Sequence, residues 1–124
     1  MRITATSISI STNRTSELAA FYARLLGVGV AHDEPGWAQI KPEPDKLVMT
    51  INFEFDEAYV APVWPSEPGR QQPQQHLDIW VDDLDEATEH AVACGATVHP
   101  HQVLEGVRVM LDPDAHPFCL FVDH

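Results

Sequence analysis

The chain has 124 residues, of which 44% are hydrophobic and 21% charged, the size and composition of one ordinary globular domain. Seven lysines and arginines against nineteen aspartates and glutamates give a net charge of −12, which disfavours nucleic acid and anionic membrane surfaces as partners. The sequence has no apolar run near the ~20 residues that span a bilayer and no signal-peptide pattern. We therefore expect a cytoplasmic protein in which Cys94 and Cys119 are free thiols.

Residues 1–55 predict a βαβββ module. Serine and isoleucine alternate through residues 7–11, which is typical of a half-buried strand. Apolar residues then recur at helical spacing from Leu18 to Leu26, and Gly27 follows where a helix is expected to end. Turn residues separate three further predicted strands, at 28–32, 37–41 and 47–55.

A second module with the same order is predicted after a connector. Residues 56–75 hold four prolines and several glutamines, which indicates a linker. Residues 76–124 then begin with a strand and a helix that Asp83 and Glu86 open in capping-box spacing. The expected strands of this half are 76–81, 97–103, 107–111 and 117–122. An overlay of the two halves aligns Ser7 with His76 and Glu54 with Cys119.

Strand alternation predicts which side chains share a face. If each helix covers the face that carries Ile10 and Leu77, the alternate residues point to the opposite face. That face combines polar, charged and aromatic groups, namely Ser7, Glu54, His76, Asp78, Trp80, Cys119 and Phe121. Because polar groups on a mostly buried face need partners, solvent or a ligand, we expect a cavity that binds a small molecule. Trp80 has an alternative interpretation as a plain core residue.

Three segments carry a resemblance to a known family: ELAAFYARLLG (17–27), QHLDIWVDDLDEATEHAVACGATV (75–98) and VRVMLDPDAHPFCLF (107–121). Together with the βαβββ order they resemble the vicinal oxygen chelate superfamily, which includes glyoxalase I, extradiol dioxygenases and bleomycin-resistance proteins, and within it the small glyoxalase-like proteins. The resemblance implies an α+β fold in which two βαβββ modules form a curved mixed sheet around a cavity, in one domain spanning 1–124. It also implies a homodimer.

The resemblance further implies metal ligands on the first and last strand of each module, at Ser7, Glu54, His76 and Cys119. Glu54 and His76 have the ligand types of metal-dependent relatives. Ser7, however, replaces a histidine or glutamine, and Cys119 replaces a glutamate, so the full ligand set is not present. Ala115 also departs from the family, because such turns usually carry glycine. A positive φ at this alanine would cost about 1 kcal/mol.

The main hypothesis is a glyoxalase-like protein that binds or converts a small molecule in this cavity, with Ser7, Trp80, Cys119 and Phe121 as ligand contacts. In one alternative, Glu54, His76 and Cys119 hold a divalent metal such as Zn, Ni, Fe or Mn, and Asp78 acts as a base. The enzyme would then be a lyase, isomerase or dioxygenase of the superfamily.

Two metal-free alternatives remain open. The protein sequesters a drug or a cationic aromatic metabolite, as bleomycin-resistance relatives do, using carboxylates and tryptophan faces. Or Glu54, His76 and Asp78 carry out acid–base catalysis. Of the other histidines, His99 and His101 are expected at the surface, and His116 is expected to hydrogen-bond to backbone in the DPDAHP turn.

Overall fold

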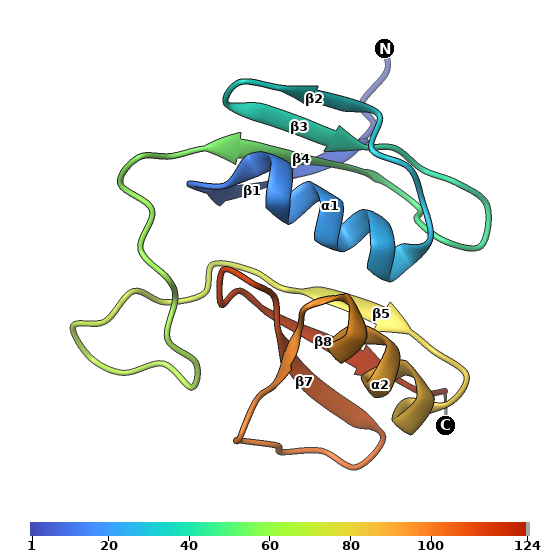
Figure 1. Ribbon diagram of the computed structural model, residues 1–124, viewed down its shortest axis with the longest axis vertical. Coiled ribbons are helices and arrows are strands. Elements are labelled where there is room, and N and C mark those ends of the chain that lie inside the picture. Colours follow the sequence, from blue (N-terminus) through green and yellow to red (C-terminus); the bar gives the residue numbers. More distant parts are fainter. Residues whose placement is uncertain (124) are drawn as a thin grey trace. The chain divides into compact units, whose positions relative to one another are not determined.

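The computed structural model describes residues 1–123, so His124 lies outside the described part of the chain. Two compact units are present, Met1–Tyr59 and the segment from Val60 onward, and each is described by itself. Each unit contains one helix and one four-stranded mixed sheet. Figure 1 labels α1 in the first unit and α2 in the second, each beside the strands of its own unit. The predicted α+β fold with two βαβββ modules is confirmed. None of the helices in residues 1–123 is long and apolar enough to cross a membrane.

The first unit follows the predicted order of elements. Its elements are β1 (Ser7–Thr12), α1 (Thr15–Leu26), β2 (His32–Glu34), β3 (Trp37–Ile40) and β4 (Thr50–Phe55). The strands lie in the order β1-β4-β3-β2, with β1 parallel to β4 and the other pairs antiparallel. The predicted strand 28–32 begins only at its last residue, because the Val28 N–H still bonds to the Ala23 carbonyl of the helix end. The predicted strand 47–55 starts late, since Leu47 closes a turn with Glu43.

Helix α1 packs its apolar stripe on the sheet. Leu18, Phe21 and Tyr22 are buried, and the Tyr22 ring stacks on Phe53 of β4 with centroids 5.7 Å apart. Gly27 ends the helix at φ 74°, a left-handed conformation that favours glycine. The apolar contact between helix and sheet therefore fixes which face of the sheet stays free of the helix.

The second unit repeats this topology. Its elements are β5 (Leu77–Trp80), α2 (Leu84–Cys94), β6 (Thr97–Val98), β7 (Val107–Leu111) and β8 (Pro117–Phe121), in the order β5-β8-β7-β6. The Asp83 carboxylate accepts the Glu86 N–H at 2.9 Å, as its capping position predicts. The predicted strand 97–103 shrinks to two residues. Beyond them the Gln102 side chain bonds to both backbone groups of Val109 and takes the place of the strand.

The surface position predicted for His99 is wrong. His99 is only 9% exposed, because its ring packs edge-to-face on Trp64 and its Nδ1 accepts the His101 N–H at 3.0 Å. His116 pairs through Nδ1 with the buried carboxylate of Asp112 at 2.8 Å, a side-chain partner that the sequence did not predict. The same carboxylate accepts backbone N–H groups within the turn and holds its shape.

Ala115 has a φ of 69°, a left-handed conformation, so the steric cost stated for a positive φ applies to this alanine. Replacing Ala115 by glycine removes the steric cost of Cβ, and we expect the free energy of unfolding to rise by about 0.5–1 kcal/mol. Urea unfolding measures this change. The matched control is Ala93→Gly on the exposed side of α2, which should destabilise by about 1 kcal/mol. A neutral or destabilising Ala115→Gly would contradict the assignment of strain.

Candidate functional site

The faces opposite the two helices carry the predicted polar side chains. In β1 the serines are exposed while Ile10 and Thr12 are buried, and in β5 Asp78 and Trp80 are exposed while their neighbours are half-buried. The predicted alternation is confirmed. Trp80 is a surface residue and not part of the core, because 67% of it is exposed.

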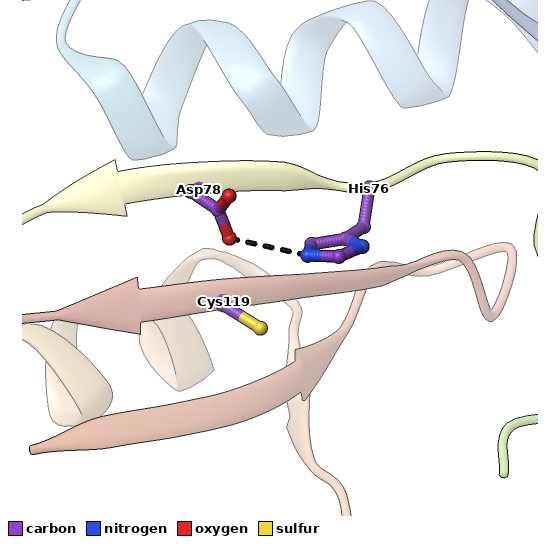
Figure 2. Close-up of side chains that lie close together, drawn as sticks. All are labelled: His76, Asp78 and Cys119. Atoms are coloured by element: carbon purple, nitrogen blue, oxygen red, sulfur yellow. Dashed lines mark ion pairs between the residues drawn. The ribbon is translucent and has the colours of Figure 1, made fainter. Parts of the chain in front are cut away.

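Three potential ligand groups converge in the second unit. Asp78 projects from β5, His76 from the residue immediately before that strand, and Cys119 from the neighbouring strand β8 (Figure 2). His76 Nε2 lies 3.2 Å from Asp78 Oδ1, and the imidazole, carboxylate and thiol donor atoms all lie within 4.8 Å of one another. The parallel register of β5 and β8 produces this grouping by placing Asp78 directly opposite Cys119. The same register places Trp80 opposite Phe121 on the same face.

The environment of Cys119 controls its protonation. Burial raises the pKa of the Cys119 thiol above its ordinary value, and the negative charge of Asp78 raises it further. The thiol is therefore protonated at neutral pH and is a poor nucleophile. His76 and Asp78 keep 51% and 60% of their side-chain surface exposed, so water screens their ion pair and it adds little to stability.

The corresponding face of the first unit has a different chemistry. Ser9 Oγ donates a hydrogen bond to Glu54 Oε1 at 3.3 Å. Asn52 Oδ1 accepts from Trp37 Nε1 at 3.1 Å and from Gln39 Nε2 at 2.9 Å. Sequence reasoning missed this polar network, although alternation along β3 and β4 already placed its members on one face.

The strand registers correct the overlay of the two halves. His76 immediately precedes Leu77, which lies opposite Phe118, so His76 and Cys119 are diagonal neighbours. In the first unit the same diagonal joins Ser9 to Glu54, whereas Ser7 lies opposite Thr50. The two aligned pairs, Ser7 with His76 and Glu54 with Cys119, are therefore inconsistent with each other by two residues, because the sequence overlay matched helix ends and last strands without knowledge of register.

The set of grouped residues also differs from the predicted one. Glu54 belongs to the first unit, and the donor group of the second unit contains Asp78 in its place. Asp78 was predicted as a base and not as a metal ligand. Alternation along β5 placed it beside His76, but the residue type gave no signal that separates a ligand from a base.

Comparisons with known proteins agree on the family and the fold. A family model described as a glyoxalase-like domain matches residues 7–121. A glyoxalase/bleomycin resistance protein/dioxygenase family enzyme from Burkholderia phytofirmans superimposes with a TM-score of 0.69 at 18% identity, over 94% of this chain and 96% of that one. These matches confirm the predicted resemblance to the vicinal oxygen chelate superfamily. In sequence, no curated protein matches the chain.

Two further solved structures share the fold. The fosfomycin resistance protein FosX from Listeria monocytogenes has a TM-score of 0.70 at 14% identity, over 100% and 96% of the two chains. A mutant of FosX is complexed with Mn(II) and 1S,2S-dihydroxypropylphosphonic acid. TnmS3, an antibiotic binding protein from a Streptomyces species, has a TM-score of 0.61 at 19% identity, over 100% and 99% of the chains. At these identities the likeness concerns the fold.

Removing the Asp78 charge should lower the pKa of Cys119. In an Asp78→Asn variant the coulombic contribution is lost while burial remains, so the thiolate forms at lower pH and alkylation by iodoacetamide is faster near neutrality. The pH dependence of the alkylation rate, measured in a Cys94→Ser background, checks this. Asp82→Asn serves as the control for a neighbouring exposed carboxylate. An unchanged or slower alkylation rate in Asp78→Asn would contradict the electrostatic effect of Asp78 on the Cys119 thiol.

Proposed function

The chain belongs to the glyoxalase-like domain family, and on that premise we propose that it binds a small molecule on the exposed sheet face of its second unit. We call this surface the β5–β8 face. It is formed by Asp78 and Trp80 of β5, by His76 just before that strand, and by Cys119 and Phe121 of β8. The observation that carries the proposal is the grouping of an imidazole, a carboxylate and a thiol within 4.8 Å. An exposed tryptophan lies on the same strand face.

Each group on the β5–β8 face has a definite role in binding. The Asp78 carboxylate accepts hydrogen bonds, and its contact with His76 Nε2 orients the imidazole. Trp80 and the neighbouring Phe121 offer aromatic surface for a flat or apolar part of a ligand. Cys119 remains a neutral thiol because its pKa is raised, which favours binding over covalent catalysis by this residue.

A divalent metal held by His76, Asp78 and Cys119 is the second candidate. Nitrogen, oxygen and sulfur donors are the set that zinc prefers, and three protein ligands are typical of catalytic zinc sites. Donor atoms of a tetrahedral zinc site lie roughly 3.5 Å apart. The donor atoms of His76, Asp78 and Cys119 lie within 4.8 Å of one another, so small side-chain rotations would bring them to that spacing. Such an ion would supply a Lewis acid that polarises a ligand oxygen. Its binding requires loss of the thiol proton of Cys119.

The two structural relatives support the two candidates in different ways. TnmS3 is an antibiotic binding protein, and a small-molecule-binding role on this fold agrees with the first candidate. The FosX complex contains Mn(II), and a metal on this fold agrees with the second. Manganese prefers oxygen donors, whereas the thiol of Cys119 favours a softer ion such as zinc.

Four further predictions stay proposals. They are a single domain, a homodimer, a cytoplasmic location and acid–base roles for Glu54, His76 and Asp78.

Small-molecule binding should perturb a defined set of backbone resonances. When a fragment library is titrated into ¹⁵N-labelled protein, we expect chemical-shift changes to concentrate in residues 76–80 and 119–121, because these strands carry the β5–β8 face. Trp80→Ala should weaken the same fragments, while Val92→Ala on exposed α2 should leave them unchanged. Shifts confined to other parts of the chain would reject this face as the binding site.

Metal binding is tested with Co²⁺ as a spectroscopic substitute for zinc. If Cys119 is a ligand, a thiolate-to-cobalt charge-transfer band appears on titration and zinc abolishes it. The band should vanish in Cys119→Ser and in His76→Ala, and it should persist in Cys94→Ser, which removes the other thiol. No band in the wild-type protein, or an unchanged band in Cys119→Ser, would exclude this metal set.

A further inference from the structure

The β5–β8 face lies in a unit with a strong excess of negative charge. From Val60 onward the sequence contains eleven carboxylate side chains and two arginines. Each arginine has an acidic partner of its own, Arg70 with Glu67 at 3.7 Å and Arg108 with Asp85 at 3.4 Å. Within residues 60–123 the ion-pair partner of Asp78 is therefore His76, which compensates its charge only when protonated.

The Asp78 charge is felt across this face. The Asp78 carboxylate lies directly opposite Cys119 in the strand register and within 4.8 Å of its sulfur, so it disfavours a second negative charge at this position. The same field favours a positive group of a ligand. Asp78 is also accessible, since 60% of its side-chain surface is exposed.

An aromatic surface lies next to this carboxylate. Trp80 is two residues from Asp78 on the same strand face, a separation of about 6–7 Å along the strand, and is 67% exposed. An indole beside a carboxylate attracts organic cations through the ring face and through charge. Trp37 differs, because its Nε1 donates to Asn52 and its ring stacks on His32 with centroids 5.2 Å apart.

From this arrangement we infer that the ligand class of the β5–β8 face is an amine joined to an aromatic ring, with the ammonium group at Asp78 and the ring against Trp80. The inference rests on the proposed small-molecule function and adds the sign of the ligand charge. An anionic ligand such as a carboxylate or phosphonate is disfavoured on this face when no metal is bound.

Three probes of similar shape test the charge. Phenethylamine, 2-phenylethanol and 3-phenylpropionate are titrated by ¹⁵N NMR in the presence of EDTA, which removes any metal. We expect the amine to bind roughly tenfold more tightly than the alcohol, and the carboxylate to bind most weakly. Equal binding of all three probes, or tighter binding of the carboxylate, would overturn the inference and leave small-molecule binding intact.

Variants assign the effect to the two side chains. Asp78→Asn should lower the affinity for the amine about tenfold and leave the alcohol unchanged, whereas Trp80→Ala should weaken both probes. Trp37→Phe is the matched control and should change neither affinity. Circular dichroism verifies that each variant is folded. We expect the variants to fold because Asp78 and Trp80 are both exposed and their replacement leaves the core intact.

Three further outcomes would overturn the inference. If none of the probes binds to the folded protein, the inference and the proposed function of this face both fail. If Trp80→Ala converts a dimer into a monomer and the probes do not bind, the face is an interface between copies and the inference is overturned. If Asp78→Asn leaves the amine affinity unchanged, the carboxylate does not recognise the cation and the inference is again wrong.

Discussion

The parallel pairing of β5 with β8 is the constraint on which the whole site depends. It brings together residues far apart in the sequence and sets Asp78 opposite Cys119 and Trp80 opposite Phe121. Because side chains alternate along a strand, a slip of one residue would turn Cys119 toward α2 and bring Leu120 onto the exposed face. Burial of Phe118 and Leu120 on the helix side opposes that slip. The apolar core thus fixes the position of polar groups that contribute little to stability themselves.

The two units show how one topology carries two chemistries. In both units the first and last strands are parallel neighbours and a helix covers one face. On the exposed face of the first unit, hydrogen-bond donors are paired within the unit, since the indole of Trp37 and the amide of Gln39 both donate to Asn52. The second unit instead gathers an imidazole, a carboxylate and a thiol at one point. The two units thus differ in the chemistry of their exposed faces while they share one topology.

Much of the fold was predictable from sequence because it follows from periodicity and turn chemistry. Helical spacing, the glycine at position 27 and the capping Asp83 located both helices. Strand alternation also assigned His76, Asp78 and Trp80 to one face. Short strands were less predictable, since β6 ends where a glutamine side chain replaces backbone pairing.

The composition of the site was only partly predictable. Register between strands depends on long-range packing, which no local pattern reveals, and the overlay therefore selected Ser7 where the structure pairs Ser9 with Glu54. His99 was unpredictable for the same reason, because the ring of Trp64 that covers it comes from a connector without periodicity. Likewise, sequence reasoning could not tell whether Trp80 is core or surface, which depends on tertiary packing.

A crystal structure of the protein soaked with phenethylamine tests the central claim most directly. We expect the ligand nitrogen within about 3 Å of an Asp78 carboxylate oxygen and the phenyl ring against Trp80. A ligand bound elsewhere on the molecule, or Trp80 buried against a second copy of the chain, would contradict the account.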